Sequence, residues 1–323
     1  MIDAYRLRLL LELSRRGTVT AVAGALGYTP SAVSQQLASL ERETGARLLE
    51  RAGRRVSLTP AGTVLSRYAA TVMATMEEAE AALAATRDSL AGPLRIGAFP
   101  TAARAILPAT LVTLGRDHPA LELRVTELDP ADVPDALRTG SLDVALTSDY
   151  DYVPAEPDTA VQSRPLLEET VYLATPDADA GTDADVGTGA AAAGPVIGDF
   201  GDAPWIAGTP GSVCHALVVR ACQASGFSPR IRHHADDFVT VLVLISAGQG
   251  VSLVPELGLA RVPSGVTLTP LAIRRRTRVA WRAGTGGHPA IAAFTAAVSD
   301  SAAARTRYTE PSVAASSGSA SVS

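Results

Sequence analysis

The chain has 323 residues, 47% of them hydrophobic, a composition typical of a soluble globular protein with room for two or three domains. The N-terminal residues lack the pattern of a signal peptide. The longest apolar run, near residues 239–247, is far shorter than the roughly 20 residues that span a bilayer. We therefore expect a cytoplasmic protein with no membrane partner.

The net charge of −5 argues against nucleic acid binding by the chain as a whole, but the charge is unevenly distributed. Residues 1–67 hold ten Arg against five acidic residues, a net charge of +5. The remainder has 18 Arg against 28 acidic residues, a net charge of −10. The basic N-terminal end is thus the candidate surface for a phosphate backbone.

Apolar residues at helical spacing predict helices over residues 2–16, 19–26 and 30–44, each followed by a glycine. Thr29 is a suitable N-cap for the third helix, and Pro30 fits its first position. Two short helices joined by a tight turn form a helix-turn-helix, whose second helix lies in the major groove of DNA. The first 44 residues therefore predict a DNA-binding unit.

The third predicted helix has two faces of different chemistry. Its apolar stripe, Val33, Leu37 and Leu40, is expected to be buried. Residues expected to contact DNA open the helix or carry small polar side chains: Thr29, Pro30, Ser31, Ser34, Gln35, Gln36 and Ser39. Among them, we expect Ser34 and Gln35 to read bases.

Residues 48–58 predict two short strands joined by a turn, with Arg51, Arg54 and Arg55 at the tip. Such a wing suits backbone phosphates or a minor groove. Replacing Arg54 should therefore weaken binding to all DNA, whereas replacing Gln35 should relax sequence preference.

The stretch TAVAGALGYTPSAVSQQLASLERETGARLLERAGRRVSLTPAGTVL resembles the N-terminal domain of LysR-type transcriptional regulators. The shared features are an Ala-rich second helix, a Ser-x-Gln-Gln face, a Leu-Glu pair and an Arg wing that closes in Leu-Thr-x-Ala-Gly. Leu49 departs from the pattern, since the family usually has Phe there. The resemblance implies a homodimer or a dimer of dimers on double-stranded promoter DNA, a small-molecule coinducer, no cofactor, and RNA polymerase as a further candidate partner.

Residues 60–89 predict a long helix with an apolar stripe at spacings of three and four: Leu65, Tyr68, Val72, Met76, Ala79 and Leu83. In the resembling family this is the linker helix of a dimer. The alternative is a stripe that packs on its own domain.

From residue 92 on, strands and helices alternate, which predicts a two-lobed α/β domain like that of periplasmic binding proteins. The fold class is thus multidomain: an all-α winged helix-turn-helix, a linker helix and a two-lobed effector domain. Strands are expected near 94–99, 121–128, 142–147, 166–175, 205–208, 230–235, 251–255, 266–273 and 278–283. The predicted boundaries are 1–59 for the DNA-binding domain, 60–91 for the linker, 92–307 for the effector domain (lobe I 92–165 and 272–307, lobe II 166–271) and 308–323 for a tail. Residues 176–201 predict a solvated loop.

Ligands of open α/β sheets bind beyond the carboxyl ends of strands, beside helix N-termini. The residues predicted at that edge, and hence to bind an effector, are Phe99, Pro100, Thr101, Leu128, Thr147, Ser148, Gly208, Thr209 and Ser212, with Asp129 beside Leu128. The alternative is that Thr101, Thr209 and Ser212 only cap helices. Phe99 favours a less polar or aromatic ligand, because relatives with carboxylate ligands often have a hydroxyl residue there.

The sequence has no motif for nucleotide hydrolysis, zinc proteolysis or serine hydrolysis, so an enzyme is the weaker alternative. A transporter's solute-binding protein is the other alternative, but the basic first 67 residues argue against it. His233 and His234 are neighbours on a strand and point to opposite faces, so we expect no metal site. Asp236 and Asp237 are expected to be the cap and the first turn of the next helix.

The two cysteines, Cys214 and Cys222, lie eight residues apart on one predicted helix, about 12 Å along its axis, which is too far for a disulfide. We expect two packed thiols, with a redox switch as the alternative.

Overall fold

The computed structural model describes residues 2–52, 55–86, 89–177 and 195–309, with the side chains of 51, 52, 55 and 306–309 left out. Most of the predicted loop at 176–201, and residues 310–323 of the predicted tail, lie outside the described residues. The described end of that loop, Ile197–Phe200, forms a short 3₁₀ helix with Ile197 buried. The predicted start of the tail at residue 308 is wrong, because residues 308 and 309 belong to a helix.

The N-terminal domain is a winged helix-turn-helix. It consists of α1 (Ala4–Arg16), α2 (Val19–Leu26), α3 (Pro30–Thr44), β1 (Leu49–Ala52) and β2 (Arg55–Leu58). The predicted caps are confirmed: the Thr29 side chain accepts the Ala32 N–H, Pro30 opens α3, and Gly45 ends it with a φ of 65°. The core between the helices includes Leu10, Val33 and Leu40, all fully buried.

The linker helix α4 runs Pro60–Ala85, and its two ends have different surroundings. Near the DNA-binding domain, Ala69 packs in the core of that domain. Further along, Tyr68 is 66% exposed, Met76 47% and Leu83 69%. Much of the predicted stripe is therefore not covered by this chain.

The effector domain is built on a six-stranded mixed sheet in the order β4-β3-β5-β10-β6-β9. The strands are β3 (Gly92–Ala98), β4 (Leu121–Glu127), β5 (Val144–Tyr150), β6 (Val161–Pro176), β9 (Ser252–Pro255) and β10 (Val266–Arg282), and β7 (Pro204–Ala207) pairs separately with β8 (Arg230–His234). The helices are α5 (Pro100–Ala105), α6 (Leu107–Asp117), α7 (Val133–Thr139), α8 (Val213–Ala224), α9 (Phe238–Ser246) and α10 (Pro289–Thr309). β3 is parallel to β4 and β5, as predicted.

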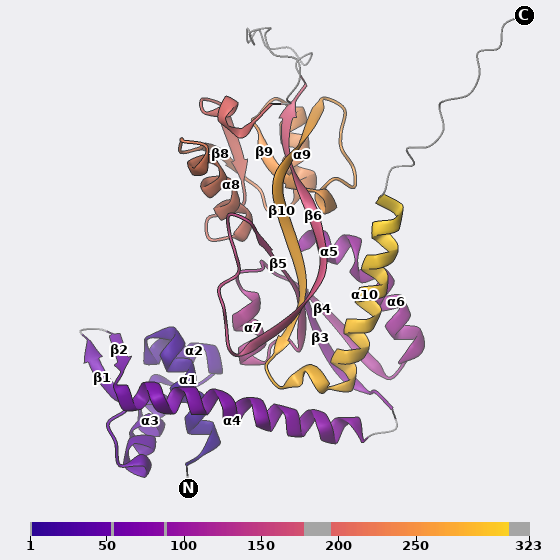
Figure 1. The fold of residues 1–323 in the computed structure, drawn as a ribbon. Coiled ribbons are helices and arrows are strands. Elements are labelled where there is room, and N and C mark those ends of the chain that lie inside the picture. Colours follow the sequence, from indigo (N-terminus) through magenta and orange to yellow (C-terminus); the bar gives the residue numbers. More distant parts are fainter. Residues whose placement is uncertain (1, 53–54, 87–88, 178–194, 310–323) are drawn as a thin grey trace, which may run out of the picture.

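Two long antiparallel strands, β6 and β10, connect the lobes (Figure 1). The sequence predicted two strands near 266–273 and 278–283, and this is wrong: β10 is one strand of 17 residues. Its pairing with β6 is irregular between Pro270 and Arg274, where the alternating pattern is also interrupted. The lobes thus form separate cores on shared strands.

Two helical features also differ from the prediction. Between β3 and β4, where the alternation of strands and helices predicts one helix, the chain forms two, α5 and α6, which are divided at Ile106, and Pro108 lies in the first turn of α6. The C-terminal α10, which has no strong amphipathic pattern, was not predicted. It packs Phe294 and Val298 into the core of lobe I. Among the described residues, no helix has both the length and the hydropathy that a membrane crossing needs.

Candidate DNA-binding surface and effector site

The outer face of α3 is free of the rest of the chain. Ser31, Ser34 and Gln35 are exposed, whereas Val33 and Leu37 on the opposite face are buried. The leucine and valine side chains hold the helix on its domain, so the polar face is presented to solvent. This is the arrangement that a recognition helix needs.

Gln36 and Ser39 have protein partners. The Gln36 side-chain oxygen accepts a hydrogen bond from Arg6 Nε at 2.9 Å, so this side chain links α3 to α1. Ser39 Oγ accepts from Arg42 at 2.8 Å. Both are less available to DNA than Gln35. The spacing of residues alone did not reveal this difference, because it depends on where Arg6 points.

The wing is held to α3 by a carboxylate. Glu41 Oε1 accepts the N–H groups of Leu48 and Leu49, at 2.8 and 3.1 Å. At the other end of the wing, Thr59 caps α4 and its hydroxyl donates to the carbonyl of Arg47 at 2.7 Å. Of the predicted phosphate contacts, Arg54 lies outside the described residues, and only the backbone of Arg51 and Arg55 is described.

A cavity of about 470 Å³ lies between the two lobes of the effector domain. Seven of the nine predicted effector residues line it: Phe99, Pro100, Thr101, Leu128, Ser148, Thr209 and Ser212. The carboxyl ends of β3, β4 and β5 meet here as predicted, and the segment before α8 faces them from the other lobe. The volume is in the range of small-molecule sites in proteins.

Thr147 and Gly208 do not line this cavity. Side chains alternate along β5, so Thr147 points away from the face that carries Ser148 and Tyr150 and lines a neighbouring cavity instead. Gly208 has no side chain, and its carbonyl accepts a hydrogen bond from His234 Nδ1 at 2.9 Å.

Of the three hydroxyl residues expected either to bind a ligand or to cap helices, only Ser212 is a cap. Its Oγ accepts the N–H of His215, at 3.1 Å. Thr101 Oγ1 accepts from Arg275, at 3.1 Å. Thr209 Oγ1 donates to Asp236 at 2.5 Å.

The ion pair at the base of the cavity was not predicted from the sequence. Arg275 and Glu169, on β10 and β6, are bonded to each other, and their side chains are 2% and 4% exposed. Burial is the largest single influence on the pKa of Arg275 and lowers it, but the Glu169 charge and hydrogen bond, together with Tyr150 and Cys214, outweigh burial and raise the pKa. The guanidinium also lies over the Phe99 ring, 4.9 Å from its centroid. The alternation of apolar and polar side chains along residues 273–282 could have predicted that the Arg275 side chain points into the domain.

Two aspartate side chains accept hydrogen bonds from main-chain N–H groups at the cavity. Asp129 accepts the N–H of Val213, the first residue of α8, at 3.2 Å, although these residues belong to opposite lobes. Asp236 accepts the N–H of Thr209 at 2.7 Å. The predicted capping role of Asp236 is therefore wrong. Asp237 is the N-cap of α9, but its side chain makes no capping hydrogen bond and pairs with Arg104 at 3.0 Å.

Both cysteines lie on α8 as free thiols, as predicted. Cys214 lines the cavity, with its sulfur 3.8 Å from the buried Tyr150 hydroxyl. Burial raises the pKa of Cys214 to about 11 and that of Cys222 to about 12. Among the described residues, no group of three or more His, Cys, Asp or Glu could hold a metal ion.

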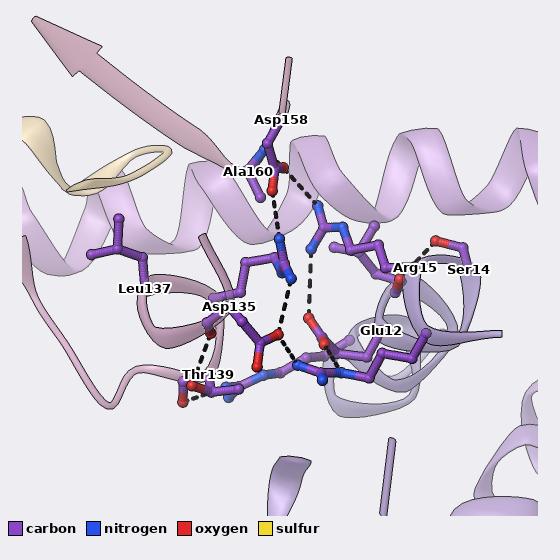
Figure 2. Close-up of polar contacts among 12 residues, drawn as sticks. Glu12, Ser14, Arg15, Asp135, Leu137, Thr139, Asp158 and Ala160 are labelled. Atoms are coloured by element: carbon purple, nitrogen blue, oxygen red, sulfur yellow. Dashed lines mark hydrogen bonds and ion pairs between the residues drawn. The ribbon is translucent and has the colours of Figure 1, made fainter. Parts of the chain in front are cut away.

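Alternating ion pairs join the DNA-binding domain to lobe I (Figure 2). Arg16 bonds Glu12 of its own helix at 2.8 Å and also Asp135 of α7. Asp158 lies 2.6 Å from Arg138 and 3.7 Å from Arg15 of α1. Three arginines and three acids share this junction, so charge is balanced there.

The linker helix is fixed to lobe I on the same side. Arg282 of β10 bonds Glu77 of α4 at 2.6 and 3.0 Å and the carbonyl of Leu137 at 2.9 Å. At Gly284 a Cβ atom would lie 2.2 Å from the carbonyl oxygen of Ala74, so only glycine permits this approach.

A winged helix-turn-helix with a free polar recognition face, joined by a helix to a hinged two-lobed domain with a ligand-sized cavity, defines a ligand-responsive DNA-binding regulator. The chain belongs to the LysR family. The family model for the LysR substrate binding domain matches residues 87–303. That for the bacterial regulatory helix-turn-helix protein of the lysR family matches residues 5–63. The protein is thus a LysR-type transcriptional regulator.

Among curated relatives, a probable hydrogen peroxide-inducible genes activator from Mycobacterium avium is 32% identical over 252 residues, covering 77% of this chain and 76% of the relative. The transcriptional dual regulator GltC from Bacillus subtilis is 27% identical over 79% of this chain and 81% of its own length. A solved cysteine mutant of OxyR from Corynebacterium glutamicum is similar with a TM-score of 0.55 and 24% identity, covering 96% of both chains. This last likeness supports the fold.

Proposed function

We propose that this regulator binds pseudo-palindromic promoter DNA through α3 and the wing, and that a small molecule in the interlobe cavity changes its binding geometry. The observation that carries the proposal is the exposed face of Ser31, Ser34 and Gln35 opposite a buried apolar stripe. In this proposal Ser34 and Gln35 read bases, Thr29 and Pro30 set the start of the helix, and the wing arginines Arg51, Arg54 and Arg55 hold phosphates.

Footprinting on the DNA upstream of the gene tests the DNA interface. Gln35→Ala should relax sequence preference by about 1–3 kcal/mol at one base position. Arg54→Ala should weaken binding to all sequences and reduce the salt slope by roughly one. Gln36→Ala is the matched control, since that side chain bonds Arg6 and should not change base preference. An effect of Gln36→Ala on preference that matches or exceeds that of Gln35→Ala would reverse the assignment.

We also propose that the protein acts in the cytoplasm as a homodimer or a dimer of dimers, with α4 as the dimer contact and RNA polymerase as a further partner. Support comes from the exposed apolar side chains of α4, among them Tyr68, Val72 and Leu83. The proposed units are a DNA-binding domain over 1–59, a linker over 60–91 and an effector domain over 92–307.

In lobe I the loop that lines the cavity leads directly into α7, which contacts α1 through Asp135. Closure of the cleft on a ligand would therefore move a helix that touches the DNA-binding domain.

A peroxide response is the second candidate function. Two observations favour it: the Mycobacterium avium relative is named a probable hydrogen peroxide-inducible genes activator, and Cys214 lines the cavity. The raised pKa of Cys214 opposes it, because the thiolate reacts with peroxide and the thiol does not. Micromolar H₂O₂ should thus leave the footprint unchanged. A peroxide-dependent footprint that is lost in Cys214→Ser would establish the second function instead.

A further inference from the structure

The interlobe cavity carries more negative than positive charge. Of the described residues that line it, four are acidic, namely Glu127, Asp129, Asp132 and Asp236, and one, Arg275, is cationic. The cavity defines the site, and its charge restricts the ligand that can enter.

Arg275 already has a buried carboxylate partner, which weakens its attraction for a ligand anion. Its Nε is bonded to the buried Glu169 carboxylate, which also accepts the N–H of Leu257 at 2.6 Å. Another of its nitrogens donates to Thr101, and its flat face covers the ring of Phe99. The guanidinium charge is therefore already neutralised inside the protein.

Two main-chain donors at the cavity that would suit an anion, the N–H groups of Val213 and Thr209, are also occupied. The first N–H groups of a helix commonly hold carboxylates or phosphates. At α8 the Val213 N–H donates to Asp129, and on the preceding segment the Thr209 N–H donates to Asp236. A ligand carboxylate would have to displace Asp129 and would then lie among the remaining acids.

A ligand cation meets no such obstacle. Each carboxylate has about four lone-pair positions, and Asp129 uses part of this capacity on the N–H groups of Ala131 and Val213. Burial and the nearby charges of Asp132 and Asp236 raise the pKa of Asp129, as expected for a carboxylate without a cationic partner. The apolar lining, including Leu128, Pro210 and Phe238, can cover a hydrocarbon body.

We infer that the effector of this cavity is a small molecule with a primary amine, or an equivalent protonated nitrogen, on a compact apolar body, and that Asp129 and Asp236 bind the charged nitrogen. The inference rests on the proposed function, in which this cavity is the effector site. It restricts the class of ligand from any small metabolite to cationic ones.

The test compares probes that share a skeleton and differ in charge, by thermal shift and calorimetry on the full-length protein. The probes are benzylamine against benzoate, and putrescine against succinate. Benzylamine or putrescine at about 10 mM should raise the melting temperature, and neither carboxylate should. Asp129→Asn and Asp236→Asn should each weaken binding of the stabilising amine at least about tenfold. Asp117→Asn, an exposed control on lobe I, should not.

Three results would overturn the inference: larger shifts with the carboxylates, no shift with either amine, or an undiminished amine response in Asp129→Asn and Asp236→Asn. If one variant does not fold, the other decides. Footprinting of the same preparation without probe tests DNA binding separately. A protein that binds amines but no promoter would disprove the proposed function alone, and one with a salt-sensitive footprint and no amine response would disprove the ligand class alone.

Discussion

At the scale of the residue, burial determines the chemistry of Cys214. Since the pKa of this thiol is raised to about 11, the protonated form persists as the pH rises through neutrality. About one thiol in ten thousand is ionised at pH 7, and the thiolate fraction rises about tenfold per pH unit up to pH 11. We predict the same slope for the rate of iodoacetamide alkylation of Cys214, measured by mass spectrometry in Cys222→Ser protein.

The other cysteine provides the control. Cys222 is fully buried and its pKa is raised to about 12, so Cys214→Ser protein should be alkylated more slowly at every pH. Rapid alkylation of Cys214 near pH 7 would mean that the thiolate is stabilised in solution. The peroxide response would then become the leading function of the cavity.

At the scale of the element, the wing and the linker helix meet at a contact that requires glycine. A Cβ atom on Gly62 of α4 would lie 2.1 Å from the carbonyl oxygen of Leu48. Gly62→Ala should therefore force the wing and α4 apart and lower the free energy of unfolding by about 1–3 kcal/mol in urea titrations. Gly24→Ala on α2 is the matched control. Nothing lies within 4 Å of its added methyl group, so stability should stay the same or rise by up to about 1 kcal/mol.

In the proposed dimer, the exposed apolar stripe of α4 forms the contact between the two chains. Placing a charge in a packed helix interface costs several kcal/mol, so Tyr68→Glu or Leu83→Glu should raise the dimer dissociation constant by about a hundredfold. Sedimentation velocity would measure the change. Val112→Glu is the control, because Val112 is 72% exposed and belongs to α6 rather than to the stripe of α4. If the stripe variants remain dimeric, the stripe is not the dimer contact.

Elements defined by local signals were predictable, whereas contacts between distant segments were not. Thr29, Pro30 and Gly45 bound α3 through groups within a few residues of one another, so their spacing predicts the helix. The pair Arg275–Glu169 joins residues 106 apart in sequence. Its position depends on β6 and β10 lying side by side, which no local pattern determines. The predicted strand ends identified most of the residues that line the cavity, because the local pattern that predicts a strand also predicts where it ends. Of the acids that determine its charge, Asp129 was predicted at this edge, whereas Glu127, Asp132 and Asp236 were recognised only once both lobes were in place.

At the scale of the whole molecule, the cavity is connected to the DNA-binding domain through one loop and the helix that follows it. The loop that carries Asp129 and Asp132 lines the cavity and leads into α7, and Asp135 on α7 bonds Arg16 of α1. Arg8 of α1 also donates to the carbonyl of Thr139, the last residue of α7, at 3.3 Å. A shift of this loop on ligand binding would therefore reach α1 through a single short helix.

The strength of this junction can be measured by neutralising its acids on lobe I. Asp135→Asn combined with Asp158→Asn removes both carboxylate partners of Arg138 and leaves Arg15 and Arg16 paired with Glu12. Losing the pairs should weaken the junction by roughly 2 kcal/mol and add repulsion between like charges. We expect a larger radius of gyration by X-ray scattering and faster hydrogen exchange in α1 and α7.

The control removes the same charge from exposed sites on the same lobe. Asp117→Asn with Glu122→Gln should leave the scattering profile unchanged, because each acid pairs only with a neighbouring exposed arginine. Raising the ionic strength should move the wild-type profile part of the way toward that of the junction variant, since partly exposed ion pairs are screened by salt. If both double variants scatter like the wild type, the contacts of α4 with lobe I, among them the Glu77–Arg282 ion pair, hold the domains together. The ion pairs of Asp135 and Asp158 then cannot be the coupling between the cavity and the recognition helix.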